Sequence, residues 1–432
     1  MLFQNPVTAQ INDTLVYSGK FSVKVDSIIV IGNRKTDTNV IKRELTFGIN
    51  DSVDSESLNY NRERIYSLGI FTKVTVSAER INLKNYVVIR VEESWYIYPI
   101  PFVELRDQDW EKISYGMDLG LRNLGGENET MQVRMGLGYD PVILLHYEYP
   151  YLFEKAKTDL IFNIAYQKVK NKSVIAEYLY RGEFNQKNYL ASIDLGKRFG
   201  LFNRIDLQLG YNYIETPFYI KGINAAGGRI DRTFSIGLDY THDTRDLAQF
   251  PSSGLYTKAE IMFMGLGIDG VNYKIADIDF REYRILFSNL RAKWRFAGRF
   301  TFGGLVPYYN YSYLGYNERI RGYFNTEMEG NDSYLGSLEL NYPLLKDMNI
   351  DLGFVPVVPK ELLSYRIALY LELFCDTGTT LMRGQNFSTR DLHTGYGTGL
   401  IFLLLPYNIL RVEYAINDIG KTEWILGLGI SF

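Results

Sequence analysis

Residues 366–373 read R-I-A-L-Y-L-E-L, so isoleucine or leucine fills every second position of this stretch. Arginine, alanine, tyrosine and glutamate fill the positions between them. Successive side chains of a β-strand point to opposite faces of its sheet, so this order predicts a strand with one apolar face. The same alternation returns at residues 233–240, 337–342 and 423–432. We therefore predict that the chain from about Tyr98 to Phe432 is built from β-strands.

The strands of this region have the length and the aromatic content of membrane-spanning strands. Alternating runs commonly cover about ten residues, which a tilted strand needs to cross a bilayer. Aromatic residues make up 15% of the chain, and tyrosines gather near the predicted strand ends at 147, 149, 151, 308, 309, 311 and 313. A sheet in lipid must close on itself, because its backbone has to form every hydrogen bond internally. We predict a transmembrane β-barrel; a soluble β-protein, whose strands are usually shorter, is the alternative.

Sixteen alternating segments can be counted, and an even number is typical of a barrel made by a single chain. Their centres lie near residues 102, 118, 134, 146, 164, 193, 209, 237, 259, 278, 306, 339, 369, 399, 412 and 428. The longest interruptions fall at 171–187, 216–228, 314–333 and 355–363. Long connections are typical of the extracellular end of such barrels. We therefore expect these connections at that end, and the turn at 251–254 at the periplasmic end.

Composition excludes several classes of protein. The chain has 47 Lys and Arg against 50 Asp and Glu, so it lacks the excess of positive charge that is typical of nucleic-acid-binding proteins. Its one cysteine, Cys375, excludes an intrachain disulfide framework, and with only three histidines a structural zinc site is not expected. No apolar run approaches the roughly 20 residues of a membrane helix, so a helical membrane protein is excluded.

A smaller unit with a different pattern precedes the long strands. Its elements follow the order strand, helix, helix, strand, strand, at residues 23–31, 40–45, 58–68, 71–79 and 86–92. The helical segments carry apolar residues at helical spacing, and a capping residue precedes each of them. About 70 residues bury only a small core, which indicates a module rather than a catalytic domain.

The first residues carry a weak export signature. Val7-Thr8-Ala9 has the small-residue spacing of a signal-peptidase site, but no basic or strongly apolar stretch precedes it. We interpret residues 1–22 as a disordered terminus with an export-signal remnant; an ordinary disordered terminus is the alternative. The predicted division is therefore 1–22, the module at 23–94 and the barrel at 95–432.

Four different motifs follow one another along the predicted barrel. They are His242-Asp243-Thr244-Arg245-Asp246 with Phe250-Pro251 and Gly254, Ile320-Arg321-Gly322-Tyr323, Phe374-Cys375-Asp376-Thr377-Gly378, and Tyr396-Gly397-Thr398-Gly399-Leu400 before the terminal Phe432. In this order they resemble the BamA/TamA-type superfamily of outer-membrane assembly and secretion barrels. The module is similar to the POTRA domain of that superfamily, through Ile28–Asn33 and Leu68–Phe71. The resemblance implies a mainly β protein, a sixteen-stranded antiparallel transmembrane β-barrel preceded by one small α+β POTRA module.

The resemblance also implies roles for single residues. The loop with Arg321, Gly322 and Tyr323 is expected to fold into the lumen, where Arg321 meets Asp376 at a strand end. Gly322 permits a backbone conformation that other residues resist, and arginine is a rigid, charged fork suited to a carboxylate. The alternative is an exposed loop arginine that contributes little. For Asp243, Thr244, Arg245 and Gly378 we expect a structural role in fixing turns and strand ends.

The resemblance also implies that the working site is the seam between the first and last strands. Pro99 and Pro101 begin the first strand, and each removes a hydrogen-bond donor. Pairing with the last strand, through Leu426, Leu428 and Phe432, should therefore be short or imperfect, which leaves an edge for a client strand. The alternative is that both prolines only stiffen the linker. By the same edge addition, the second strand of the POTRA sheet is expected to receive clients.

These implications give one function and one alternative. The chain is expected in the outer membrane of a Gram-negative bacterium, with its POTRA module in the periplasm. There it would insert unfolded outer-membrane or secreted protein clients into the bilayer, with periplasmic chaperones and accessory lipoproteins as further partners. A two-partner-secretion pore that exports an unfolded polypeptide is the alternative. We expect no enzyme, because His146, His242 and His393 lie on separate segments without a matched serine and acid. Neither function consumes a cofactor, and we expect no metal and no nucleic acid.

Overall fold

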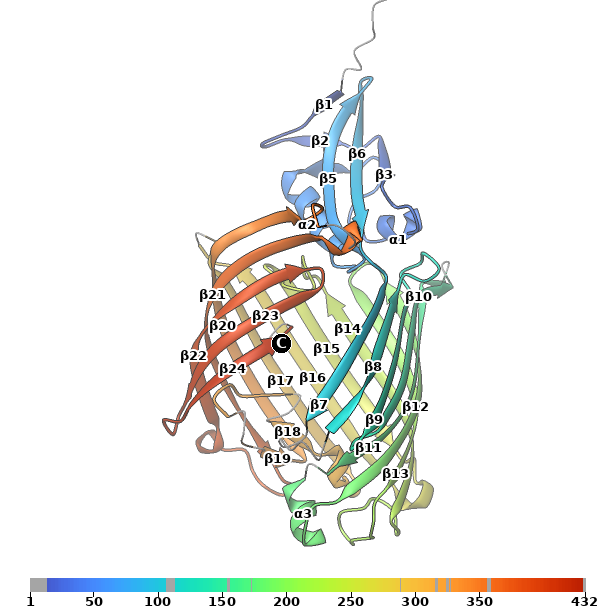
Figure 1. Ribbon diagram of the computed structural model, residues 1–432, viewed down its shortest axis with the longest axis vertical. Helices are drawn as coiled ribbons and strands as arrows, with labels where there is room; N and C mark the ends of the chain where they lie inside the picture. Colours follow the sequence, from blue (N-terminus) through green and yellow to red (C-terminus); the bar gives the residue numbers. More distant parts are fainter. Residues whose placement is uncertain are drawn as a thin grey trace, which may run out of the picture.

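The computed structural model describes residues 14–105, 113–153, 156–171, 173–287, 289–314, 318–323, 326, 328–355 and 359–429. A small α+β module stands on one end of a barrel of long strands (Figure 1). We call this end of the barrel the module end and the opposite one the far end. Among the described residues, no helix is long and apolar enough to span a membrane.

The module contains the predicted order of strand, helix, helix, strand and strand. These elements are β3 (Ser27–Ile31), α1 (Thr38–Lys42), α2 (Ser55–Tyr66), β5 (Phe71–Ile81) and β6 (Lys84–Glu93), and a small hairpin of β2 (Ser22–Lys24) and β4 (Ser52–Asp54) accompanies them. Asp54 begins α2 because its side chain accepts a hydrogen bond from the Ser57 backbone N–H, while the Ser57 hydroxyl accepts one from the Asp54 backbone N–H. The helices and the sheet enclose a small apolar core that includes Ile41, Ile65 and Ile89.

Part of the terminus predicted to be disordered is an ordered strand. β1 (Thr14–Val16) pairs antiparallel with Glu79–Ile81, so the module's sheet has the order β1-β5-β6-β3. The prediction for residues 1–22 was therefore wrong for this segment, because its backbone groups find partners on the outer edge of β5. The expected signal-peptidase spacing at residues 7–9 lies outside the described residues.

The barrel is one sheet of sixteen strands in which neighbours in sequence are neighbours in space, from β7 to β24. The predicted fold class is therefore confirmed. The strands are β7 (Ile97–Leu105), β8 (Ile113–Arg122), β9 (Thr130–Gly138), β10 (Val142–Phe153), β11 (Thr158–Lys170), β12 (Asn185–Phe199), β13 (Asn203–Glu215), β14 (Ile230–Asp243), β15 (Gly254–Met264), β16 (Tyr273–Ile285), β17 (Arg291–Gly303), β20 (Asp332–Asp351), β21 (Ser364–Leu381), β22 (His393–Leu405), β23 (Asn408–Asn417) and β24 (Thr422–Leu428).

Short elements lie in the connections between the strands. They are α3 (Val174–Tyr180), β18 (Ser312–Leu314), β19 (Met328–Gly330) and the 3₁₀ turns η4 (Ile268–Gly270), η5 (Tyr308–Asn310), η6 (Lys360–Leu362) and η7 (Thr389–Asp391). β18 and β19 pair with each other within the long connection from β17 to β20.

The alternating pattern places apolar side chains outside the barrel. Leu371 and Leu373 are 39% and 52% exposed, whereas Tyr370 and Glu372, at the alternate positions, are 1% and 0% exposed. A soluble protein would bury the leucines and expose the glutamate. The reversed order suits a barrel whose outer surface contacts lipid.

One of the four long connections lies at the opposite end from the one predicted. The connections at 171–187, 216–228 and 314–333 share the far end, but the connection between β20 and β21 lies at the module end. Asp351 pairs with Ser364 beyond the rim, and Arg366 forms an ion pair with Glu63 of the module. The prediction for residues 355–363 rested on loop length, and it missed that these two long strands extend past the rim toward the module (Figure 1).

Candidate functional site

The connection between β17 and β20 brings Arg321 into the barrel. Gly322 has a φ of +96°, a left-handed conformation that favours glycine. Gly395 on β22 lets the loop approach, because a Cβ there would lie 1.7 Å from the Arg321 carbonyl oxygen. A side chain at position 395 would therefore push the loop away from the strand.

Arg321 forms a bidentate ion pair with Asp376 on β21. Its Nε lies 2.6 Å from Asp376 Oδ2 and its Nη2 lies 2.8 Å from Oδ1. The Arg321 backbone N–H also donates to Oδ2, and the guanidinium lies 3.8 Å from the centre of the Phe374 ring. Both charged residues are buried, at 7% and 2% exposed. The two residues that sequence reasoning paired are thus brought together, and the role of the pair stays a prediction.

Three further carboxylates surround the same guanidinium, and sequence reasoning missed all three. Arg321 Nη1 lies 2.9 Å from Glu413, 3.0 Å from Glu339 and 3.4 Å from Glu372, and each glutamate is 0% exposed. We call Arg321, Asp376, Glu339, Glu372 and Glu413 the loop-anchor cluster. Two of these glutamates could have been found from the sequence. Each lies between two leucines, at 371–373 and 338–340, and a charged residue between lipid-facing leucines must face the inside of the barrel.

Two more cations complete the surroundings of the loop-anchor cluster. Lys293 on β17 forms an ion pair with Glu339, and Arg411 lies 3.1 Å from Glu413. Four carboxylates therefore face three cations: Asp376, Glu339, Glu372 and Glu413 against Arg321, Lys293 and Arg411. Removing one partner of a buried ion pair leaves an uncompensated charge, so we expect this set of contacts to hold the loop in place.

The tip of the loop also reaches the last strands. The Gly322 N–H donates to Glu423 of β24 at 3.2 Å, and its carbonyl accepts from Asn417 at 2.8 Å. The Tyr323 hydroxyl donates to Asp418. Gly378 lets both β20 and the loop pack closely, because a Cβ there would lie 2.6 Å from the Tyr334 carbonyl oxygen of β20 and 3.2 Å from the Ile320 side chain of the loop.

The first and last strands are not joined by backbone pairing in the part of each that the structure describes. β7 pairs with β8 and β24 pairs with β23, and the sheet order ends at these two strands. Pro99 lies opposite Leu119 and Pro101 opposite Met117. Leu426 and Leu428 are 76% and 74% exposed. Phe432, the remaining predicted seam residue, lies outside the described residues.

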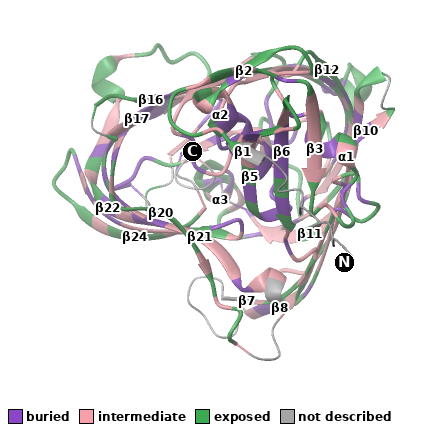
Figure 2. Ribbon diagram, turned by 90° about the horizontal axis from the view of Figure 1, so that it is seen from above, coloured by how far each residue is buried: buried purple, intermediate pink, exposed green. Residues whose placement is uncertain are grey.

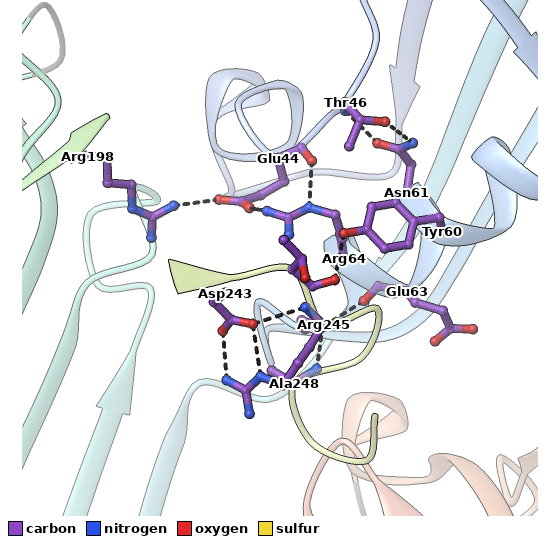
Figure 3. Close-up of polar contacts among 12 residues, drawn as sticks. Glu44, Thr46, Tyr60, Asn61, Glu63, Arg64, Arg198, Asp243, Arg245 and Ala248 are labelled. Atoms are coloured by element: carbon purple, nitrogen blue, oxygen red, sulfur yellow. Dashed lines mark hydrogen bonds and ion pairs between the residues drawn. The ribbon is translucent and has the colours of Figure 1, made fainter. Parts of the chain in front are cut away.

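The Asp243-Thr244-Arg245 motif forms the turn between β14 and β15, and this turn contacts the module (Figure 3). Arg245 donates to both Asp243 oxygens at 2.9 and 2.7 Å. The Tyr60 hydroxyl of α2 donates to the Thr244 carbonyl at 2.9 Å, and burial raises the pKa of Tyr60, which keeps it a neutral donor. The Ala248 N–H donates to Ser67 Oγ at 2.9 Å. The turn was expected to be structural, and in the structure it also contacts the module.

Ion pairs and a shared apolar core hold the module over the barrel mouth (Figure 2). Glu44 bridges Arg64 of α2 at 2.8 Å and Arg198 of the barrel at 3.3 Å. Phe250 from the β14–β15 turn packs on Tyr370 of β21 at 4.9 Å between ring centres. One apolar core joins these two rings with module residues such as Phe71. The module, the turn and the strand ends therefore pack together at this end of the barrel.

The predicted non-catalytic histidines lie on three different strands. His146 on β10 contacts Asn163 at 2.7 Å, His242 on β14 contacts Asn203 at 2.9 Å, and His393 on β22 packs against the Tyr323 ring. In the described part of the chain, no group of three or more His, Cys, Asp or Glu residues is arranged to hold a metal ion.

Family models match both parts of the chain. The Omp85 superfamily domain matches residues 123–432, and the POTRA family, described as surface antigen variable number repeat, matches residues 23–94.

Individual relatives agree with these matches. The outer membrane protein assembly factor BamA of Neorickettsia risticii (strain Illinois) is 23% identical over 423 residues, which cover 91% of this chain and 52% of that protein. The chain thus spans about half the length of this curated relative. A crystal structure of Haemophilus ducreyi BamA lacking POTRA domains 1–3 has a TM-score of 0.54 at 16% identity, covering 96% of this chain and 89% of that one. CdiB from Acinetobacter baumannii has a TM-score of 0.50 at 14% identity, covering 94% and 73%. At these identities the two structures show the shared fold.

Proposed function

The chain belongs to the Omp85 superfamily, and we propose that it inserts protein clients into the outer membrane through the seam between β7 and β24. Family membership indicates the outer membrane of a Gram-negative bacterium, with the POTRA module in the periplasm. The proposed clients are unfolded outer-membrane or secreted proteins, with periplasmic chaperones and accessory lipoproteins as further partners. Client folding in the bilayer would supply the free energy, so the proposed process uses no cofactor.

The unpaired seam is the observation that carries this proposal. In the described residues, β7 and β24 each pair on one side only. An unpaired edge in hydrocarbon exposes N–H and C=O groups that have no water to bind, so it favours the addition of another strand. Backbone addition of this kind needs no particular client sequence, and side-chain pockets supply selectivity.

The occupied lumen supports a lateral route over a conduit. The loop-anchor cluster holds the loop inside the barrel, and the module with the β14–β15 turn covers the module end. A two-partner-secretion pore, the alternative function, would require both obstacles to leave the path of the polypeptide. The lateral route requires only that the client add to an edge that is already unpaired.

Locking the seam distinguishes the two functions. In a Cys375→Ser background, a short bis-maleimide would join Val103→Cys on β7 to Leu426→Cys on β24 in liposomes. A matched control joins Val412→Cys to Leu426→Cys, because these positions already face each other in the β23–β24 pair.

For the proposed function we expect the seam link to stop folding of an unfolded barrel client and the control link to leave it intact. Client folding at the normal rate with the seam linked would refute lateral insertion. Translocation of the client into the vesicle lumen under that condition would support the conduit.

A further inference from the structure

Two lysines face each other on neighbouring strands near the far end of the barrel. Lys168 of β11 lies directly opposite Lys187 of β12. Asn171 N–H donates to the Phe184 carbonyl at 2.9 Å, so hydrogen-bonded pairs of these strands recur at every second residue from there. Lys168 and Lys187 fall between two such pairs, where opposite side chains are closest. Like charges in this position destabilise a sheet, and a bound anion would remove that cost.

Both lysines lie on the lipid-facing surface. Ile164 shares the face of Lys168 and Ile193 shares that of Lys187, and the two isoleucines are 46% and 43% exposed. A row of tyrosines lies between the isoleucines and the lysines: Tyr166, Tyr189 and Tyr213. Neighbouring ring centres in this row are 4.9 and 5.4 Å apart. Tyrosine gathers where hydrocarbon meets lipid headgroups, so the lysines beyond this row lie at the level of the headgroups.

The charges around the two lysines are unbalanced. We call the following residues the basic patch: Lys168, Lys170, Lys187, Arg229 and Arg232, with Glu183 and Glu215. Glu215 lies 3.6 Å from Lys187 and 2.6 Å from Arg229, so one carboxylate serves two cations. Lys168 forms no ion pair within the part of the chain that the structure describes. The patch therefore has an excess of positive charge, and Lys168 is its uncompensated member.

The seam side of the barrel has no such patch at the same level. The outward positions near the far ends of β22, β23 and β24 hold only uncharged residues in the described chain: Thr394, Tyr396, Tyr414, Ile416, Thr422 and Trp424. A ring of cations around the whole rim would suit any anionic surface. Cations gathered on β11 to β14 indicate a local site instead, and β8 to β10 separate this site from β7.

We propose that the basic patch binds a phosphate-bearing lipid of the outer leaflet, with a phosphate group held between Lys168 and Lys187. The inference goes beyond the proposed function and uses only the orientation that family membership indicates, in which the far end meets the outer leaflet. A phosphate offers several charged oxygens to the two ammonium groups. Headgroup phosphates lie at the level of the patch, and the acyl chains below them would contact Tyr166 and Ile164.

Other occupants fit the patch less well. A soluble acidic protein would have to approach through the lipid that covers Ile164 and Ile193, because these side chains are exposed beside the patch. A second copy of this chain that presented the same face would bring the same excess of positive charge and be repelled. Free phosphate would neutralise the lysines but would gain nothing from the apolar surface next to them, so a lipid should bind more tightly.

Binding of lipid to the full chain in neutral detergent micelles tests the inference. The probes are diphosphoryl lipid A, the same lipid with its phosphates removed, and inorganic phosphate. Native mass spectrometry counts the bound lipid, and thermal unfolding measures the effect of each probe on stability. We expect only the phosphorylated lipid to bind saturably and to raise the unfolding temperature. Equal binding of the dephosphorylated lipid, or equal stabilisation by inorganic phosphate at the same phosphate concentration, would refute the inference.

A matched pair of variants locates the site. Lys168→Gln removes the uncompensated lysine, whereas Lys197→Gln removes a lysine from the outward face of β12 at the module end, opposite Thr158. We expect Lys168→Gln to weaken binding of the phosphorylated lipid about fivefold, as for the loss of one lysine near a charged lipid surface. Lys197→Gln should leave the binding unchanged. Equal affinities of the two variants would contradict a site at the far end.

The facing lysines also predict a change of sign. Without lipid, Lys168→Gln relieves the repulsion from Lys187, so the unfolding temperature of the variant should equal or exceed that of the wild type. With the phosphorylated lipid at a concentration that saturates the wild type, the order should reverse, because the variant loses a contact with phosphate. If Lys168→Gln lowers the unfolding temperature by the same amount in both conditions, the lysine has only a structural role and the inference fails.

Discussion

Arg321 and Asp376 form a two-pronged ion pair inside the barrel, with Nε–Oδ2 and Nη2–Oδ1 distances of 2.6 and 2.8 Å. The pair joins a loop from the far end to an inward-facing position of β21. Because the third guanidinium nitrogen faces Glu339, Glu372 and Glu413, one arginine holds four carboxylates together. The loop therefore connects β20, β21 and β23 from inside the barrel.

Arg321→Ala should release the loop and destabilise the barrel. Removing one partner of a buried ion pair costs about 3–5 kcal/mol, because the other charge stays buried without compensation. Arg321→Lys keeps the positive charge but cannot bind Asp376 through two nitrogens, so we expect a loss of stability between those of the wild type and Arg321→Ala. Urea unfolding of the barrel and client folding in liposomes would measure the effect. Arg390→Ala, in an exposed loop of the far end, is the control, and equal behaviour of the alanine variants would contradict the anchoring role.

Glu372→Gln should be tolerated, whereas Glu413→Gln should not. Glu372 is the glutamate farthest from Arg321, at 3.4 Å, and its replacement balances three carboxylates against three cations. Glu413 lies 2.9 Å from Arg321 and 3.1 Å from Arg411, so its loss weakens two charged hydrogen bonds. We expect a change below about 1 kcal/mol for Glu372→Gln and a loss of about 1–3 kcal/mol for Glu413→Gln. Urea unfolding would measure both isosteric variants, and a loss for Glu372→Gln as large as that for Glu413→Gln would contradict the idea that Glu372 is the surplus charge.

The Glu63–Arg366 pair should couple the module to the barrel. The two charged groups lie 2.5 Å apart, with side chains that are 11% and 15% exposed. A double-mutant cycle with alanine at both positions should give a coupling of about 1–3 kcal/mol for this partly buried contact. The exposed Lys73–Glu92 pair within the module is the control, where we expect less than about 1 kcal/mol. Pulse proteolysis of the module in urea would measure both cycles, and equal couplings would argue against docking by this pair.

Much of the fold follows from local pattern. Alternation along segments such as 366–373 predicts the strands and their outer faces, because a lipid-facing strand needs apolar residues at every second position. The connection between β20 and β21 was placed at the wrong end, because loop length does not reveal that both strands extend past the rim to reach Glu63.

Part of the candidate site could be predicted from the sequence, and part could not. The motifs around Arg321 and Asp376 lie in short, recognisable stretches, so their pairing could be expected. Glu339, Glu372 and Glu413 come from three strands, and only closure of the barrel brings them to one guanidinium. The contact of Glu44 with Arg198 spans 154 residues, and no local pattern indicates which charges of the module and the rim will meet.

The edge of the POTRA sheet should bind an extended peptide more tightly once its own terminal strand is removed. β1 pairs with Glu79–Ile81, and the Tyr17 N–H donates to the Ala78 carbonyl at 3.0 Å, so part of the β5 edge is already occupied. A peptide that adds to β5 must displace this segment or use the remaining edge, and displacement subtracts the lost pairs from its affinity. Deleting residues 1–16 keeps Tyr17, with its side-chain hydrogen bond to Asn85, and frees the part of the edge at Glu79–Ile81. We expect an affinity gain of up to about tenfold, measured by fluorescence anisotropy of a labelled strand peptide. Deleting residues 1–13 leaves β1 intact and serves as the control; equal peptide affinities of the two truncated chains would mean that β1 does not compete for this edge.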